Sequence, residues 1–218
     1  LSQQTLMEMM FAGVMNRDRF CRSLDEPKPI GEWHNVVVDG NGCVTRIEMY
    51  GLSLIGTVAM EWLPATVYRM ELSKNRLVGS VNLEGLPNGL NRFAMSMNAL
   101  TGSLKLDTLP ETLKWFNVQI NKFCGSVDLT CLPKELVGLS IGLNSLSGRL
   151  DLTSLPPCLE TLDLSQNIFY GETDFSQIPD SLINLNVSGN PDLSGEVSDE
   201  KEEIVLLAGS RVKSVRQG

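Results

Sequence analysis

The chain has 218 residues, of which 42% are hydrophobic and 20% charged, which is the composition of an ordinary folded protein. The net charge of −8 argues against a nucleic-acid partner, because phosphate binding requires a basic surface. No apolar run approaches the roughly 18 residues of a membrane span, so we expect no membrane insertion within this segment.

The five cysteines, at positions 21, 43, 124, 131 and 158, have the spacing of neither a zinc site nor a redox motif. Unlinked thiols in a reducing compartment are the favoured interpretation. Localisation stays open on the sequence, with a cytoplasmic location favoured over an extracellular one.

Residues 1–39 are predicted to form an N-terminal cap that consists of an amphipathic helix and a strand. Apolar residues recur at helical spacing from Leu6 to Met15, and Ser2 is the expected N-cap. The methionines are either an adaptable face for a partner or the core side of a lid over the first repeat. We expect the lid, because a solenoid end exposes apolar surface. A Pro/Gly connector at 25–32 should lead to strands at 36–38 and 44–47.

Residues 40–200 consist of seven repeats of a 23-residue unit, which start at 40, 63, 86, 109, 132, 155 and 178. Positions 8 and 10 of each unit are apolar, and position 2 is proline in repeats two to seven. In the first six repeats, position 15 is Leu or Phe and position 17 is glycine. The last repeat has one extra residue, so its glycine, Gly195, comes one place late. Position 13 is asparagine in repeats two to seven: Asn75, Asn98, Asn121, Asn144, Asn167 and Asn190.

Apolar side chains two residues apart lie on one side of a strand, so positions 8 and 10 predict an inward-packed strand in each repeat. Stacked repeats would pair these strands into a parallel sheet. The position-13 asparagines, a structural asparagine ladder, can donate to and accept from the backbone of their own turn and of the next repeat. Positions 19 and 21 alternate again, as in Val81 and Leu83, which predicts a short second strand on the opposite side.

The resulting pattern, LxxLxLxxNxLxG, resembles that of the leucine-rich-repeat family over about three quarters of the chain. The added GxLxL segment is similar to repeats of plant receptor-like proteins and of protist, notably kinetoplastid, proteins. The resemblance implies a β-rich solenoid, a right-handed horseshoe or arc of about seven repeats with a parallel concave sheet, short convex-side strands and a helical N-terminal cap. The block Trp33–Val38 resembles the cap of the plant extracellular class, with Asn35 and Val38 in place of the usual Gly and Cys.

In that family the residues between the buried leucines line the concave face, which usually binds the partner. Here they occupy positions 7, 9, 11 and 12 and form columns with neighbours about 4.8 Å apart. Arg46, Arg69 and Arg92 form an arginine ladder at position 7, beside Glu48 and Glu71 at position 9. The ladder is interpreted either as charge pairing across the sheet, which contributes little at a surface, or as a clamp for a partner's carboxylate or phosphate.

Trp115 projects outward in the middle of the stack, and Gly138, next in its column, should leave room beside the indole. Tryptophan at an interface centre is often an anchor that contributes about 2 kcal/mol or more. The position-12 residues Met97, Ile120 and Leu143 form an apolar stripe beside it, which is either an exposed binding patch or tucked under the following turn. The candidate partner-binding residues are Arg46, Tyr50, Arg69, Glu71, Arg92, Met97, Trp115, Asn117, Gln119, Ile120 and Leu143.

The only histidine, His34, lies in the cap and is expected to be structural, and no nucleotide-loop, zinc-protease or serine-hydrolase signature is present. We therefore expect no enzyme, no cofactor and no metal, but a monomeric module that binds a protein or peptide partner on its concave face. The alternative is an extracellular domain that recognises a peptide or glycan, in which Asn186-Val187-Ser188 would be a glycosylation sequon. Residues 201–218 are expected to form a C-terminal capping element.

Overall fold

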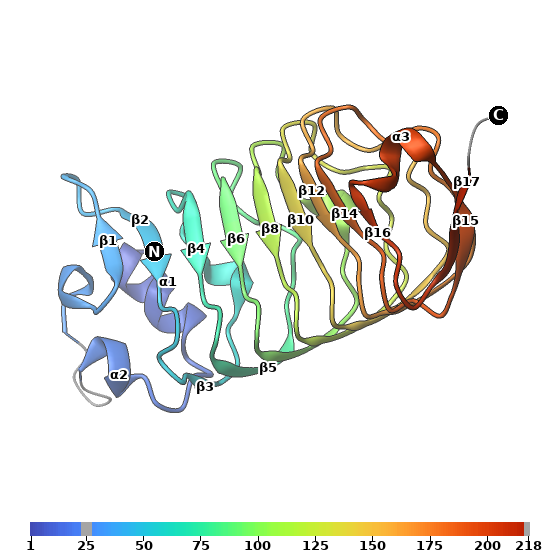
Figure 1. Ribbon diagram of the computed structural model, residues 1–218. Helices are drawn as coiled ribbons and strands as arrows, with labels where there is room; N and C mark the ends of the chain where they lie inside the picture. Colours follow the sequence, from blue (N-terminus) through green and yellow to red (C-terminus); the bar gives the residue numbers. More distant parts are fainter. Residues whose placement is uncertain (23–27, 216–218) are drawn as a thin grey trace.

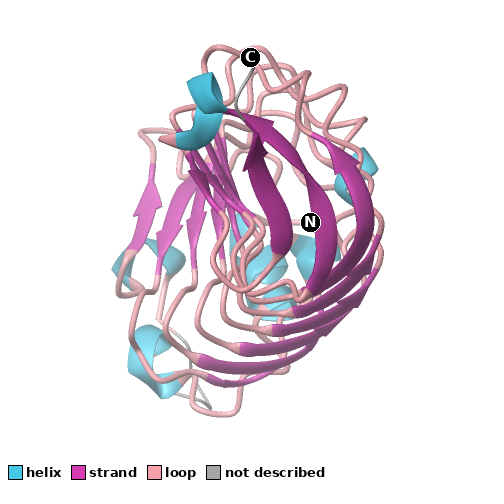
Figure 2. Cartoon of the chain, turned by 45° about the vertical axis from the view of Figure 1, so that its right-hand side comes forward, coloured by secondary structure: helices cyan, strands magenta, loops and turns pink. Residues whose placement is uncertain are grey.

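The computed structural model describes residues 1–22 and 28–215. The chain coils into a β-solenoid of about seven turns whose two sheets lie on opposite sides of a buried core (Figures 1 and 2). The predicted fold class is thus confirmed. Residues 25–27 of the predicted connector and residues 216–218 of the predicted C-terminal element lie outside the described part.

The first sheet contains one strand from each repeat, closed at its N-terminal edge by an antiparallel strand. Its strands run parallel in a register that advances by one repeat per strand, since Arg46 pairs with Arg69, Arg69 with Arg92 and Arg92 with Trp115. In spatial order the strands are β1 (Val36–Val38), β2 (Val44–Glu48), β4 (Arg69–Glu71), β6 (Arg92–Ala94), β8 (Trp115–Asn117), β10 (Gly138–Ser140), β12 (Thr161–Asp163), β14 (Asn184–Asn186) and β16 (Val205–Leu206).

The inner side of this sheet is apolar, as positions 8 and 10 predict. Phe116 is 1% exposed, and its ring stacks on Phe93 of the preceding repeat with centroids 5.3 Å apart. Such offset or stacked aromatic pairs contribute beyond the area that they bury. The core is therefore a continuous column in which each repeat packs on its neighbours.

The position-13 asparagines form a hydrogen-bonded ladder beside this core. Nδ2 of Asn121 donates to the carbonyl oxygens of Val118 and Met95, both at 3.0 Å, and Oδ1 accepts from the N–H of Leu100 at 3.0 Å. The same three bonds recur at Asn75, Asn98, Asn144, Asn167 and Asn190. Each amide thus joins its own turn to the preceding repeat, whereas the sequence led us to expect the next one.

The second sheet lies across the core from the first, and its strands were placed wrongly from the sequence. In repeats two to five they occupy about positions 14–18, and the strands of repeats six and seven extend further, to Asp174 and Ser198. At positions 19 and 21 of repeat two, Val81 and Leu83 instead pack into the core from a loop segment. In spatial order the strands are β17 (Arg211–Val215), β15 (Asp192–Ser198), β13 (Ile168–Asp174), β11 (Ser145–Gly148), β9 (Lys122–Gly125), β7 (Ala99–Gly102), β5 (Arg76–Ser80) and β3 (Ile55–Gly56). Alternating burial alone does not identify a strand, because a loop that crosses the core can alternate too.

The N-terminal end of the stack is covered by α1 (Gln3–Met10) and α2 (Asp18–Cys21). Ser2 is the N-cap of α1, as predicted, and its Oγ accepts from the N–H of Thr5 at 3.1 Å. Met7 and Met10 are fully buried, so this side of the helix forms a lid. The segment that follows α1 passes close to the first repeat at Gly56, where a Cβ would overlap with the carbonyl oxygen of Gly13. Short 3-10 helices occur at η1 (Ile30–Glu32), η2 (Met60–Trp62) and η3 (Leu106–Thr108).

At the C-terminal end, the charged run from Asp199 begins as the short helix α3 (Asp199–Glu202), and the two following apolar segments become β16 and β17. These strands extend the first and second sheets by one place each. Lys201 in α3 forms an ion pair with Asp180 at 3.0 Å. The last repeat is therefore covered by a shortened turn of the same coil.

Candidate functional site

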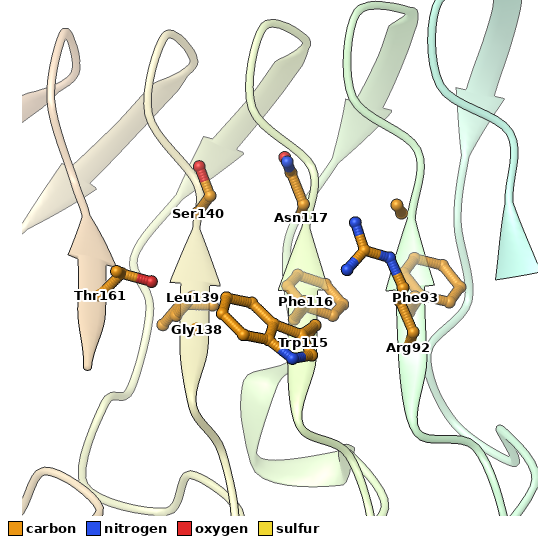
Figure 3. A pocket seen from close by; sticks show the side chains of 10 residues that line it. Arg92, Phe93, Trp115, Phe116, Asn117, Gly138, Leu139, Ser140 and Thr161 are labelled. Carbon is orange, nitrogen blue, oxygen red and sulfur yellow. The ribbon is translucent and has the colours of Figure 1, made fainter. Parts of the chain in front are cut away.

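A cavity of about 260 Å³ lies on the outer face of the first sheet, centred on Trp115 of β8 (Figure 3). Its floor is the sheet itself, over Phe93, Phe116 and Leu139. The outward side chains around it come from four adjacent strands, β6 to β12, because each strand contributes its positions 7 and 9 to the same face. They belong to Arg92, Trp115, Asn117, Ser140 and Thr161.

The indole of Trp115 reaches from β8 across β10, where it lies against Gly138 (Figure 3). A Cβ at Gly138 would overlap with the indole carbons Cε3 and Cζ3, so the glycine provides the space that the ring occupies. Trp115 is nevertheless 38% exposed. The ring therefore rests on the sheet and keeps part of its surface open to solvent. Gly142, in contrast, faces Asp163 and Ser165 and does not adjoin the ring.

The arginine ladder is divided by its ion pairs. Arg69 Nε lies 3.1 Å from Glu48 Oε1, and Arg46 Nη1 lies 3.9 Å from the same oxygen. Glu71 turns its Oε1 to the backbone N–H of Ser73, at 2.9 Å. Charge pairing across the sheet is therefore seen for Arg46 and Arg69. Arg92 instead lines the cavity, where the second interpretation, a clamp for a partner's anionic group, stays open.

A second cavity, of about 240 Å³, continues across the same face towards the C-terminal end. It shares Ser140 and Thr161 with the first cavity. Its other outward residues are two neutral amides, one carboxylate and one exposed apolar side chain: Asn184, Asn186, Asp163 and Leu206. None of them is among the residues expected from the sequence, although Asp163, Asn184 and Asn186 occupy positions 7 and 9 of the repeat.

The apolar stripe of Met97, Ile120 and Leu143 is exposed and not tucked under the turn. None of its members lines the cavity that holds the indole. All three have left-handed backbones, with φ of +55° at Met97 and Ile120 and +51° at Leu143. The first and last repeats have glycine at this position, Gly51 and Gly189, which adopts such a φ without strain.

The remaining candidates have local partners. Tyr50 is exposed, and the Lys74 ammonium lies 5.7 Å from its ring centroid. Asn117 Oδ1 accepts from the N–H of Gln119 at 3.1 Å, and Gln119 Oε1 accepts from the Ser140 hydroxyl at 3.1 Å. These bonds hold the polar rim of the cavity in place.

The carboxyl groups whose pKa is lowered lie elsewhere, in loops that follow strands of the second sheet (Asp128 and Asp151) or at the end of β13 (Asp174). The hydroxyl of Thr130 and then its N–H donate to Asp128 and lower the pKa of that carboxyl. Thr153 lowers the pKa of Asp151 in the same way. Among residues 1–22 and 28–215, no group of three or more His, Cys, Asp or Glu side chains could hold a metal ion. Nor does any helix in that part have the length and apolarity to cross a membrane.

No model of a protein family matches the sequence, and no curated protein matches it either. Solved structures do match the coil. The ectodomain of the receptor kinase SOBIR1 from Arabidopsis thaliana superposes with a TM-score of 0.60, at 20% identity over 79% of this chain and 96% of that one. This chain has the leucine-rich-repeat fold.

Two further solved structures share the leucine-rich-repeat fold. Pollen Receptor Kinase 3 has a TM-score of 0.61 and 22% identity, with 97% of this chain and 96% of that chain covered. The plant peptide hormone receptor RGFR1 in complex with RGF2 has a TM-score of 0.54 and 23% identity, over 77% of this chain and 28% of that one. At these identities the likeness concerns the fold.

Proposed function

We propose that this protein is an interaction module that binds a protein or peptide partner on the outer face of its first sheet, centred on Trp115. The observation that carries the proposal is the indole laid over Gly138 in an open cavity at the middle of the stack. A large, partly exposed aromatic ring on a rigid strand loses little entropy on binding, which is why such residues serve as anchors.

The shape of the face favours an extended segment of the partner. The two cavities share residues and together reach from β6 to β16, which are six neighbouring strands. Five strand spacings of about 4.8 Å give a length of about 24 Å, which matches about seven residues of extended chain. Most of the outward residues along it are polar and provide donors and acceptors, while Trp115 and Leu206 are the exposed apolar ones near its two ends. The peptide complex of RGFR1 supports this choice of partner, since that receptor has the same fold.

The test is an affinity pull-down from native material with the wild-type protein, Trp115→Ala and the control Tyr170→Ala. Tyr170 is an exposed aromatic residue on the second sheet, so its truncation removes a similar group from the opposite side. We expect partners captured by wild type and by Tyr170→Ala to be lost with Trp115→Ala. Equal capture by all three proteins would refute the assignment of the site.

A second candidate function is extracellular recognition of a ligand, which the likeness to the SOBIR1 ectodomain favours. If this function is correct, the protein passes through a compartment in which the sequon at Asn186 can be glycosylated. Asn186 Oδ1 accepts from both the N–H and the hydroxyl of Ser188, at 3.1 and 2.7 Å. Mass spectrometry of the native protein would decide: an unmodified Asn186 together with a reduced Cys43 would count against this function.

A further inference from the structure

The arginine column of the first sheet extends one repeat further than the glutamate column beside it. Repeats one and two have Glu48 and Glu71 at position 9, whereas repeat three has Ala94, which pairs in register with Glu71. Arg92 is thus the arginine whose own strand has no carboxylate at position 9.

The structure shows the consequence for its charge. Among the described residues Arg92 forms neither an ion pair nor a side-chain hydrogen bond, while Arg46 and Arg69 share Glu48. The Nε atoms of all three arginines are shielded from solvent and make no hydrogen bond, although Arg69 Nε lies within ion-pair distance of Glu48. What sets Arg92 apart is therefore the missing counter-charge. Glu71, the nearest candidate in the column, is already engaged by the N–H of Ser73. A shielded donor group without a partner calls for an explanation.

Arg92 also differs in its surroundings, since it lines the cavity of Trp115. Its guanidinium lies between β6 and β8, on one side of β8, and the indole extends over β10 on the other (Figure 3). The cavity therefore offers an uncompensated planar cation and a partly exposed aromatic ring to one ligand. The rest of its outward residues, Asn117, Ser140 and Thr161, are neutral.

We propose that Arg92 binds a carboxylate of the partner segment, next to a flat apolar group that rests on Trp115. This inference rests on the proposed function, because it assumes that the partner occupies this face. The guanidinium fork matches the two oxygens of a carboxylate, and both groups gain when they pair away from water. One unpaired guanidinium also matches one negative charge, whereas a phosphate monoester carries about −1.5 to −2 and would remain partly uncompensated.

A carboxylate can come from a chain terminus or from an acidic side chain, and small probes distinguish the two. Amide NMR would follow the Nε–H signals of Arg92 and Trp115 during titration with three compounds. N-acetylphenylalanine carries a terminal carboxylate, N-acetylglutamyl-phenylalanine amide carries a side-chain carboxylate, and N-acetylphenylalanine amide carries none. We expect at least one acid to bind about tenfold or more tightly than the neutral amide, because hydrogen bonds to charged groups are the stronger ones. The preferred acid identifies the source. Equal affinity for all three, or binding of none, would overturn the proposal.

Three variants test whether Arg92 is the residue that causes the preference for the acid over the neutral amide. Arg92→Gln should abolish the preference for the acid. Arg149→Gln, which removes an exposed arginine away from this cavity, should retain it. Ala94→Glu would restore the glutamate column and give Arg92 an internal partner, so it should also abolish the preference while leaving the arginine in place. Circular dichroism would establish that all three are folded. A preference that survives both Arg92→Gln and Ala94→Glu would refute the role of Arg92.

The pull-down separates this inference from the function on which it rests. If partners are lost with Trp115→Ala but retained by Arg92→Gln, the face binds its partner without the carboxylate contact, and only the present inference fails. If partners are retained by Trp115→Ala, the proposed function fails first.

Discussion

The two sides of the first sheet differ in how regular they are, although the same short strands provide the side chains of both. On the inner side the pattern recurs, because positions 8 and 10 are buried apolar residues in every repeat and Asn121 bonds to the preceding repeat as its counterparts in repeats two to seven do. On the outer side the residues change from a charged ladder through Trp115 to neutral amides. The inner side holds the coil together, and the outer side is free to differ because no neighbour constrains it.

The largest expected contrast is between two adjacent residues of β8. Phe116→Ala should lower the free energy of unfolding by about 3–5 kcal/mol, because it leaves a cavity in a core that cannot collapse around it. Trp115→Ala should cost about 1 kcal/mol or less, since its ring packs against the sheet on one face. Urea denaturation of both variants measures the difference. A similar loss for the two would mean that Trp115 is a core residue and not an outward anchor.

A slightly smaller contrast is expected between two asparagines of the same repeat. Asn121→Ala removes bonds to the backbone of Leu100, Met95 and Val118 and leaves those groups unsatisfied, so a loss of about 3 kcal/mol is expected. Asn117→Ala removes one bond on the outer side, to the N–H of Gln119, and should cost about 1 kcal/mol or less. Thermal unfolding would compare them. Equal losses would show that the ladder contributes no more than a surface bond.

Much of the inner side was predictable because it is periodic. A strict repeat determines which residues are neighbours, so the register of β2 to β14 and the column of asparagines follow from the spacing alone. The strands of the second sheet could not be located from the spacing, because Val81 and Leu83 are both buried, with an exposed residue between them, although they lie in a loop.

On the outer side the spacing predicts which residues are adjacent but not how they pair. The pairing depends on side-chain conformations, which the spacing does not determine. Glu48 pairs with two arginines, Glu71 accepts from Ser73, and Trp115 lies over Gly138. Nor does the spacing show that position 12 is left-handed, although Gly51 and Gly189 at that position were a signal.

Gly138→Ala tests whether the outer side depends on the place of the indole. The new Cβ would overlap with the ring and would lie 2.9 Å from Thr161 Oγ1, so Trp115 must move. Because Gly138 has no left-handed φ, the backbone of β10 should tolerate alanine, and a loss of about 1–2 kcal/mol is expected. The NMR signal of the Trp115 indole N–H should shift, whereas Ser140→Ala should leave it in place. An unchanged signal in Gly138→Ala would contradict the observed packing.

The smallest expected effect has the opposite sign and concerns the exposed stripe. Ile120 is 38% exposed and has a φ of +55°, a conformation that costs a non-glycine residue about 1–2 kcal/mol and that asparagine adopts more readily. Ile120→Asn should therefore stabilise the protein by about 0.5–1 kcal/mol. The matched control is Ile168→Asn, which makes the same exchange at an exposed strand residue without a left-handed φ, where asparagine is disfavoured and a small loss is expected. Denaturation midpoints would resolve the two signs. A stabilising Ile120→Asn would show that isoleucine is present at this position despite its backbone, which is the behaviour expected of a residue that contacts a partner and not of one that serves the fold.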